Sequence, residues 1–288
     1  MPHEAYACDI CALPTAHWFE VHGFQYYECR ACDYAFLPPP VRERQTTETL
    51  FDEAYFSGGG AGYADYAAES ALLRKHGRDY GKILRRRCGP LRLLDVGCAA
   101  GFVLSGLLDA GHRGAGLEPS ASMARTARQD LGLDVETGTL EEYISPNPFE
   151  CLTMIQLVDH LLDVRRALER AANATASEGY WLFEFGNRAS VTARLLREGW
   201  HEYAPPSVLR VFSLHGLTRL CAQYGFSLQA HGRPRKVLLA GHAKSLLRFK
   251  AADSRAAGLL SRLVSLLPDG VSIPYPGDDT CWALFRRS

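Results

Sequence analysis

The sequence predicts an α/β fold, in which helices cover both faces of a largely parallel β-sheet, with a small separate module at the N-terminus. Three observations support this prediction. Short apolar runs alternate with amphipathic runs between residues 91 and 185, which is the pattern of β-α-β units. A glycine-rich turn follows the first run, and an acidic residue ends the second strand. Two closely spaced cysteine pairs near the N-terminus precede three consecutive prolines.

The element order follows from this alternation. We expect strands at 91–96, 114–118, 134–137, 151–156 and 179–185, and helices at 101–111, 120–131 and 160–176. Further helices are expected at 213–224 and 256–267, and a final antiparallel strand near the sheet edge at 281–286. Ligands bind beyond the carboxyl ends of parallel strands, so the residues directly after each strand are the candidates for a site.

The turn after the first strand is the most informative segment. An apolar run broken only by Asp95 leads into this turn, whose glycines let the backbone approach a ligand closely. About 20 residues further on, Glu118 ends the second strand, at the spacing of an acidic residue that binds ribose hydroxyls. The candidate nucleoside-binding residues are Asp95, Gly97, Cys98, Ala99, Gly101, Phe102, Glu118 and Pro119.

Asp95 distinguishes between nucleoside cofactors. A dinucleotide places its pyrophosphate at the helix N-terminus of such a turn, and a carboxylate there would repel it. S-adenosylmethionine has no phosphate but carries a cationic α-amino group and a sulfonium, which a carboxylate favours. The sequence therefore indicates S-adenosylmethionine rather than NAD. An ordinary Rossmann-like turn with a chance aspartate is the alternative.

These motifs resemble those of the class I S-adenosylmethionine-dependent methyltransferases, from about Tyr55 to Phe226. Residues 149–163 are similar to the family's fourth strand and following helix, with Asp159-His160 where members usually have Glu-His. Residues 182–200 are similar to a subgroup with an N-terminal zinc ribbon, which includes sugar C-methyltransferases and natural-product methyltransferases. The resemblance implies a Rossmann-like sheet and methyl transfer to O, N or C of a small-molecule acceptor in such a biosynthetic pathway.

The resemblance also implies cofactor contacts beyond the glycine turn. Leu140, through its backbone, and more weakly Glu141 fall where family members contact adenine, and Gln156 falls near the methionine end. Residues 51–69 correspond to a lid over the cofactor, with candidate contacts at Tyr55, Tyr63 and Tyr66. The alternatives are a buried glutamine that satisfies backbone groups and a loop whose tyrosines pack on the core.

His160 and Asn187 are the candidate catalytic residues. A histidine is the natural base near neutral pH, and His160 is expected to begin the helix after the fourth strand; a capping or packing histidine is the alternative. Asn187 follows the fifth strand and could position a substrate hydroxyl or carbonyl. Similar enzymes carry histidines before Phe212-Ser213, where this chain has Val208 and Arg210. This difference has three alternative explanations: the chain uses another base, it acts on another substrate, or Arg210 binds an anionic substrate.

Two CxxC knuckles, Cys8-Cys11 and Cys29-Cys32, have the spacing of a zinc ribbon. Four thiolates complete a tetrahedral site with no open position, so the zinc is expected to be structural. The intervening residues 18–28 predict a hairpin that turns at His22-Gly23. Free reduced cysteines are the alternative, which would leave this small module without a core.

The predicted organisation is a zinc ribbon (1–40), a linker and cofactor lid (41–80) and a methyltransferase domain (81–288) with a substrate insertion at 188–212. The 288 residues carry 32 basic and 32 acidic side chains. Zero net charge argues against a dedicated nucleic-acid binder, whose affinity comes largely from neutralising phosphates. An RNA methyltransferase and a non-catalytic relative that binds the cofactor or a partner protein remain as alternatives.

The sequence says less about the cellular location and the oligomeric state of the protein. No run of 18 apolar residues predicts a membrane span, and the first residues lack the features of a signal peptide. Scattered cysteines outside the two knuckles fit a reducing compartment, so a cytoplasmic protein is expected. The sequence makes no prediction of the oligomeric state.

Overall fold

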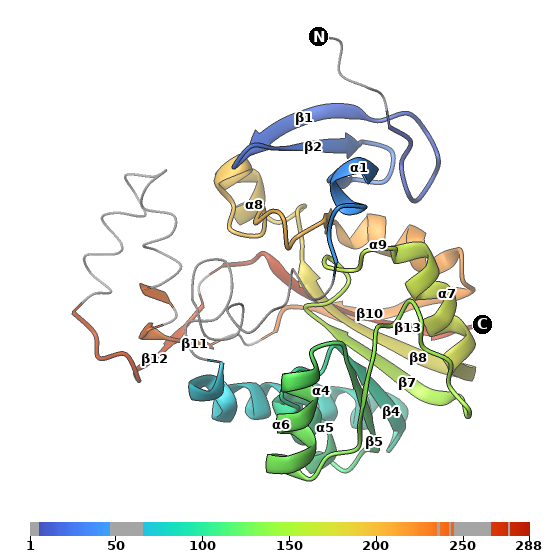
Figure 1. The fold of residues 1–288 in the computed structure, drawn as a ribbon, viewed down its shortest axis with the longest axis vertical. Coiled ribbons are helices and arrows are strands. Elements are labelled where there is room, and N and C mark those ends of the chain that lie inside the picture. The colour runs from blue at the N-terminus through green and yellow to red at the C-terminus, as the bar shows by residue number, and fades with distance from the viewer. Residues whose placement is uncertain (1–5, 47–65, 235–236, 242, 245–265, 276) are drawn as a thin grey trace.

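The computed structural model describes residues 6–46, 66–234, 237–241, 243–244, 266–275 and 277–288. The expected lid tyrosines Tyr55 and Tyr63 and nearly all of the expected helix 256–267 lie outside these residues. Figure 1 shows a central twisted sheet with helices on both faces and a smaller antiparallel module beside one end of it. The predicted α/β class is therefore confirmed.

Seven strands form the central sheet. Their spatial order is β10 (Phe226–Gly232), β13 (Thr280–Arg287), β8 (Thr175–Gly186), β7 (Phe149–Ile155), β4 (Arg92–Val96), β5 (Arg113–Glu118) and β6 (Val135–Thr137). The run from β8 to β6 is parallel, and β13 lies antiparallel between β8 and β10. The final strand is thus next to the edge, as expected, and β10 forms the edge itself.

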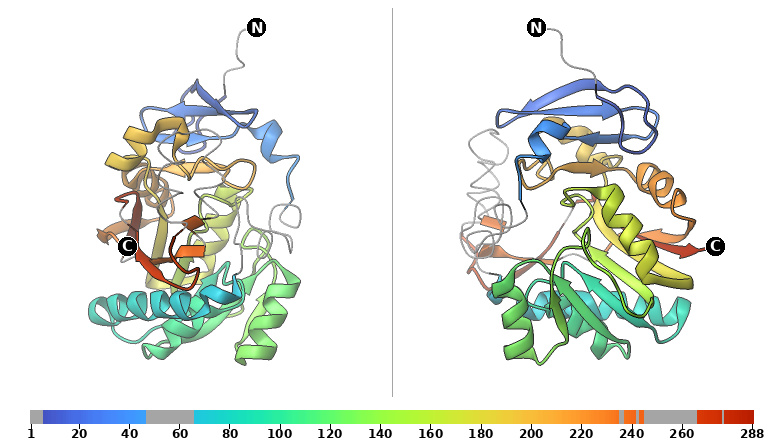
Figure 2. Two further views of the ribbon diagram at one scale, coloured as in Figure 1. Left: turned by 90° about the vertical axis from the view of Figure 1, so that its left-hand side faces the viewer. Right: turned by 45° about the vertical axis from the view of Figure 1, so that its right-hand side comes forward.

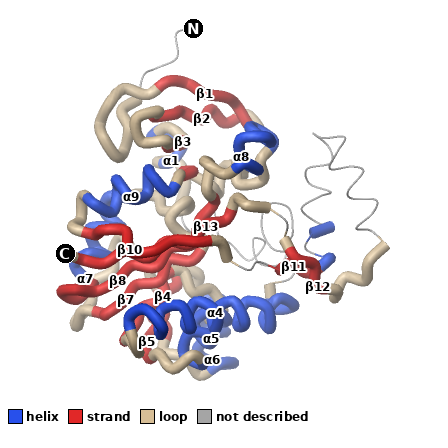
Figure 3. The backbone as a smooth tube through the Cα atoms, turned by 180° about the vertical axis from the view of Figure 1, so that it is seen from behind, coloured by secondary structure: helices blue, strands red, loops and turns tan. Residues whose placement is uncertain are grey.

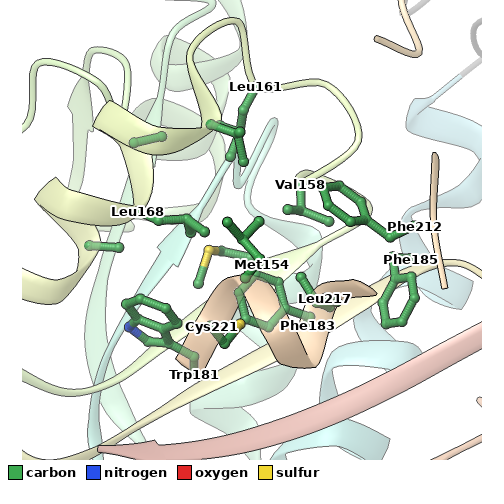
Figure 4. Packing of buried hydrophobic residues seen from close by; sticks show 14 of the residues in the cluster. Met154, Val158, Leu161, Leu168, Trp181, Phe183, Phe185, Phe212, Leu217 and Cys221 are labelled. Carbon is green, nitrogen blue, oxygen red and sulfur yellow. The ribbon is translucent and has the colours of Figure 1, made fainter. Parts of the chain in front are cut away.

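Helices cover each face because successive strand residues point to opposite sides. One face packs against α4 (Ser70–Cys88), α5 (Phe102–Asp109) and α6 (Ala121–Leu131), and the other against α7 (Val164–Ala174) and α9 (Leu214–Ala222). Each face has its own buried cluster. Leu93 belongs to the first cluster, on the side of α4, α5 and α6, and Leu94 belongs to the second cluster, on the side of α7 and α9. Figure 4 shows the second cluster, where Met154 and Phe183 of the sheet meet Leu217 of α9. In the described part of the chain, no helix has the length and apolar character to cross a bilayer.

The N-terminal module and a segment of the larger domain build one antiparallel sheet. β1 (Ala16–Val21) and β2 (Phe24–Cys29) form the predicted hairpin, and β3 (Tyr34–Phe36) pairs with β2. β9 (Arg210–Phe212), from the expected insertion, completes the sheet beside β3. Figures 1 and 2 place β1, β2 and α8 (Val191–Leu196) together on the same side of the central sheet.

The remaining elements are short. They are α1 (Pro39–Arg42), two 3₁₀ helices, η1 (Ala67–Glu69) and η2 (Arg197–Gly199), and the pair β11 (Val237–Leu239) and β12 (Ser272–Pro274).

One predicted boundary is wrong in a way that affects the site. The helix after the fourth parallel strand begins at Val164, so His160 lies in a turn rather than at a helix start. Asp163 explains the difference, because its carboxylate accepts the backbone N–H groups of Arg165 and Arg166 at 3.1 and 3.0 Å. These are the N-cap bonds that begin a helix directly after the capping residue.

Two glycines allow α4 and α5 to pack at backbone contact. A Cβ at Gly77 would lie 2.1 Å from the carbonyl oxygen of Val103, and one at Gly106 would lie 2.1 Å from that of Arg74. Neither carbonyl can move without displacing its helix. The position of α4 against the glycine turn therefore depends on these two residues.

We predict that Gly77→Ala lowers the free energy of unfolding by roughly 1–3 kcal/mol, the cost of overpacking a close contact. Urea denaturation measures this change. Gly199→Ala is the control, because no atom lies within 4 Å of a Cβ built there, and it should change stability little. Equal stability of Gly77→Ala and the parent would contradict the packing described.

Candidate functional site

The glycine turn joins β4 to α5 at the carboxyl edge of the parallel strands. Gly97 and Gly101 have φ values of +70° and +81°, in the left-handed region that glycine adopts without cost. Ala99 also lies in this region, at +46°, where a Cβ costs roughly 1–2 kcal/mol. The N–H of Gly97 donates to the Leu117 carbonyl at 2.8 Å, so the turn is fixed against β5.

Glu118 connects the two strands at this edge. Its carboxylate accepts the N–H of Ala99 at 2.8 Å on one oxygen and the N–H of Ser120 at 2.8 Å on the other. The side chain is buried; burial raises the pKa of Glu118, and the two N–H groups oppose this rise. Each carboxylate oxygen has two acceptor positions, so both oxygens keep one position for a ligand hydroxyl.

Asp95 carries an unused acceptor in the interior. Thr153 donates its hydroxyl to Oδ1 of Asp95 at 2.6 Å, whereas Oδ2 is buried with no hydrogen-bond partner among the described residues. Burial and, to a smaller extent, the neighbouring carboxylate of Glu118 raise the pKa of Asp95 to about 7, against the opposing effect of the Thr153 hydroxyl. A buried oxygen without a donor is costly, so this geometry fits a cationic group held against Oδ2.

Aromatic side chains cover the turn. The rings of Tyr66 and Phe102 stack with their centroids 5.5 Å apart, and Tyr66 packs in one buried cluster with Ala99 and Ala100. The structure thus brings the one described lid tyrosine to the predicted cofactor residues. On the neighbouring loop, the Leu140 side chain is buried in the core, which leaves only its backbone for a ligand.

Glu141 makes structural contacts instead of lying open to a ligand. One of its carboxylate oxygens accepts the N–H groups of Leu162 and Asp163 at 3.1 and 3.4 Å. These bonds hold the loop that precedes α7. The weak assignment of Glu141 to adenine stays a prediction, which would fall to its other carboxylate oxygen.

Sequence reasoning missed a buried network around Glu184 of β8. Its carboxylate accepts Nε2 of Gln156 at 2.9 Å, lies 2.6 Å from Nε2 of His76 and accepts the hydroxyl of Tyr80. Gln156 has a φ of +52°, a strained value for a residue with a side chain. The network holds Gln156 at the end of β7. A charged residue within the apolar run 180–186 was the available signal.

His160 has a defined tautomer. Its Nδ1 lies 2.8 Å from the carbonyl oxygen of Ser207, which can only accept, so Nδ1 carries the proton and Nε2 carries the lone pair. Burial lowers the pKa of His160. The imidazole is therefore neutral near pH 7, the form in which it can remove a proton.

Arg210 is not available to a substrate, which overturns the expectation that it could bind an acceptor anion. The side chain is 1 % exposed. Its guanidinium donates to the carbonyl of Leu161 and, at 3.1 Å, to that of Leu162, while Nε lies 3.3 Å from Oδ2 of Asp9. Arg210 thus ties the N-terminal module to the turn that carries His160. Val208 is likewise buried, among apolar side chains of both modules.

Asn187 has a structural role through its oxygen. Oδ1 accepts the N–H groups of Ala189 and Leu214 at 3.2 and 3.3 Å, and the Asn187 N–H donates to the Asp279 carbonyl at 2.6 Å. A contact with a substrate would therefore fall to the side-chain NH₂ group.

A second polar cluster, also missed, lies where the 188–212 segment meets the start of β13. Trp200 and Tyr275 donate to Oδ2 of buried Asp279 at 2.6 and 2.9 Å. His201 lies between two carboxylates, 3.6 Å from Asp279 and 3.3 Å from Glu202. Glu202 also packs against Gly186, at the end of β8. The segment thereby adds acidic and aromatic groups beside the ends of the parallel strands.

The four N-terminal cysteines have the arrangement of a metal site. Their Sγ atoms all lie within 4.8 Å of one another, with Cys11 and Cys29 at 3.6 Å. Tetrahedral zinc at about 2.3 Å from each sulfur implies S–S distances of about 3.8 Å. The N–H of Ile10 points to the Cys8 sulfur at 3.3 Å, as in a knuckle that holds a thiolate. The donor set therefore fits one zinc ion.

The pKa of Asp95 gives a prediction on stability. Because its pKa is about 7 in the folded chain and 3.8 ordinarily, the folded state binds more protons than the unfolded state between these values. Its contribution to stability is therefore lost as the pH rises through this window. Between about pH 5.5 and pH 8 the loss is roughly 2 kcal/mol, at about 1.4 kcal/mol per pH unit.

Asp95→Asn lacks this titration, so its stability relative to the parent should improve by that amount from the lower to the higher pH. Urea denaturation at both values measures the difference. Asp134→Asn, at an exposed aspartate, is the control. A relative stability of Asp95→Asn that is independent of pH would contradict the buried acid described.

Comparison with known proteins places these features in a family. A family model described as a methyltransferase domain matches residues 64–231. Two curated ubiquinone biosynthesis O-methyltransferases, from Bradyrhizobium diazoefficiens and Nitrobacter winogradskyi, are 27% and 28% identical over 156 and 147 residues. These alignments cover 48% and 44% of this chain and 62% and 56% of the relatives, so less than two thirds of each relative is matched.

Solved structures agree on the fold. A putative methyltransferase from Bacillus halodurans superposes with a TM-score of 0.54 at 13% identity, covering 73% of this chain and 98% of its own. Magnesium protoporphyrin IX methyltransferase from Synechocystis gives 0.51 at 13% identity, covering 77% and 85%. The family match extends over more than half of the sequence, from Tyr66 through the glycine turn to β10. The chain therefore belongs to the methyltransferase-domain family and has the fold of the class I S-adenosylmethionine-dependent methyltransferases.

Proposed function

We propose that this protein transfers a methyl group from S-adenosylmethionine to a hydroxyl of a small-molecule acceptor. The observation that carries the proposal is the pair of buried carboxylates at the glycine turn, Asp95 and Glu118, with acceptor positions left for a cation and a ribose. The curated relatives are named as O-methyltransferases, which favours oxygen over nitrogen or carbon. The subgroup resemblance of residues 182–200 favours an acceptor from natural-product or sugar biosynthesis.

The chain's own groups define how the donor would be held. Glu118 would accept the ribose hydroxyls, and Oδ2 of Asp95 the α-amino group, directly or through water. The backbone of the turn, at Gly97, Cys98, Ala99 and Gly101, and the side chains of Tyr66, Phe102, Pro119 and Gln156 would enclose the nucleoside and methionine, with Leu140 beside the adenine. When bound, S-adenosylmethionine supplies an electrophilic methyl group, so the protein has mainly to align the acceptor and exclude water.

His160 would act as the base for a hydroxyl acceptor. Its Nδ1–H is fixed on Ser207, which leaves the lone pair on Nε2, and burial keeps the imidazole neutral. A hydroxyl is a weak nucleophile until its proton is removed. The NH₂ group of Asn187 would position the acceptor oxygen, and residues 188–212 would form the wall of its pocket.

The N-terminal module would bind one structural zinc ion through Cys8, Cys11, Cys29 and Cys32. We assign residues 1–40 to this ribbon, 41–80 to the linker and lid, and 81–288 to the methyltransferase domain. Four thiolates leave no open coordination position. The metal would therefore supply rigidity to the knuckles and no chemistry at the methyl group.

The cofactor assignment predicts that Glu118→Gln weakens S-adenosylhomocysteine binding about tenfold or more, because a charged hydrogen bond to the ribose is worth roughly 1.5–3 kcal/mol. Isothermal titration calorimetry measures the affinity. Glu150→Gln is a matched control, because Glu150 also accepts a backbone N–H, from Arg92 at 2.6 Å, but lies at the opposite end of the parallel strands. Equal affinities of the parent, Glu118→Gln and Glu150→Gln for S-adenosylhomocysteine would contradict the assignment of Glu118 to the ribose.

The base assignment predicts that His160→Asn lowers turnover about 10²- to 10⁴-fold, while affinity for S-adenosylhomocysteine changes less than about twofold. Release of S-adenosylhomocysteine over a panel of hydroxyl acceptors measures turnover. Because the pKa of His160 is lowered, parent activity should persist below about pH 6.5 and decline only under the lowered pKa. Turnover by His160→Asn equal to the parent's would show that another group, or none, removes the proton.

A further inference from the structure

We propose that Arg210, neutralised by Asp9, is a positioning residue for His160, so that the first cysteine knuckle takes part in orienting the catalytic base. The proposal rests on the proposed function, in which His160 removes a proton. It assigns to the N-terminal module a task beyond stability: setting the geometry of the acceptor side of the site.

Residues 207–210 contact the ring of His160 and the residues on both sides of it. The imidazole donates to the Ser207 carbonyl at 2.8 Å. The N–H groups of Leu209 and Arg210 both donate to the Asp159 carbonyl, at 2.9 and 3.1 Å. The Arg210 guanidinium donates to the carbonyls that follow His160, those of Leu161 and Leu162. The residues before and after His160 and the ring itself are therefore fixed by the same short segment.

The charge of Arg210 makes this clamp depend on the N-terminal module. A guanidinium that is 1 % exposed requires a counter-charge, because an unpaired buried ion costs several kcal/mol. Among the described residues, the carboxylate in salt-bridge contact with Arg210 is Asp9, at 3.3 Å from Nε. Asp9 lies between Cys8 and Cys11 in the first knuckle. The charge of Arg210 also acts on Glu141 and Asp159, where it opposes the rise of each pKa that burial causes. The knuckle therefore supplies the counter-charge that is in direct contact with the guanidinium.

Asp9 is itself held firmly. Its Oδ2 accepts Arg42 at 2.8 Å and the Tyr34 hydroxyl at 3.0 Å, and its Oδ1 accepts Arg42 at 3.3 Å. Tyr34 belongs to β3, which pairs with the strand that begins at Arg210. The guanidinium reaches the loop carbonyls and the carboxylate at once, because its donors form a rigid planar fork.

Other contacts keep the module docked when this ion pair is broken, which separates positioning from folding. Tyr26 donates to the Val208 carbonyl at 2.7 Å, and Arg188 pairs with Glu28 at 2.5 Å. The β3–β9 hydrogen bonds are also independent of Asp9. Loss of the Asp9 charge should therefore lower stability, because Arg210 keeps its buried charge, but these contacts should keep the module docked while the His160 turn gains freedom.

The test uses the full-length, zinc-loaded chain with Asp9→Asn and Arg210→Met. Arg210→Met removes the clamp without leaving an unpaired buried cation, since Arg42 still neutralises Asp9. We expect each variant to lower kcat about tenfold or more, with S-adenosylhomocysteine affinity within about twofold of the parent. Arg219→Gln is the control, because Arg219 also spans the two modules, donating to the Ala31 carbonyl at 3.0 Å, without touching the His160 turn.

Nitrogen-15 NMR of the His160 ring provides a readout independent of turnover. In the parent and in Arg219→Gln we expect the Nδ1–H tautomer fixed by Ser207, and in the two test variants a shift toward mixed tautomers. A parent-like tautomer and kcat in both variants would overturn the proposal. If instead the tautomers shift while His160→Asn keeps full turnover, the positioning stands and the role of His160 as base fails.

Discussion

The pairing of β3 with β9 joins the N-terminal module to the larger domain in one sheet. Without β9, the three short strands of the N-terminal module would end in an open edge, which small sheets must cover or pair. Without β3, the segment that contains β9 would lack the backbone partners that hold it against the turn that carries His160. The N-terminal strands and β9, which are far apart in the sequence, therefore form one sheet. This sheet borders one side of the candidate site, and the ends of the parallel strands border the other.

Buried charge is concentrated where a ligand would explain it. Asp95, Glu118 and Glu184 are each 2–3 % exposed, although a buried carboxylate costs stability unless it is well partnered. Glu184 has three donors, whereas Oδ2 of Asp95 has none in the described part of the chain. Arg210 is like Glu184, because groups of the chain itself satisfy its described hydrogen bonds. Buried charge alone thus does not identify a binding residue; an unfilled hydrogen-bonding position does.

The sequence predicted what depends on local spacing and missed what depends on distant contacts. The order of the strands β4 to β8 along the chain, the carboxylate of Glu118 at the end of β5 and the cysteine knuckles follow from short motifs, because each is encoded within one β-α-β unit or one turn. The sequence pattern predicts a helix start at His160, whereas the N-cap formed by Asp163 starts α7 at Val164. The roles of Arg210 and Glu184 require partners more than 20 residues away, which no local pattern contains.

Hydrogen–deuterium exchange with S-adenosylhomocysteine tests whether the glycine turn and Glu118 form the binding site for S-adenosylmethionine. We predict that ligand slows exchange of the backbone amides of residues 97–102, Glu118 and Ser120, with no protection at the cysteine knuckles of residues 8–11 and 29–32. Unchanged exchange at the glycine turn under saturating ligand, or protection confined to another part of the chain, would contradict it.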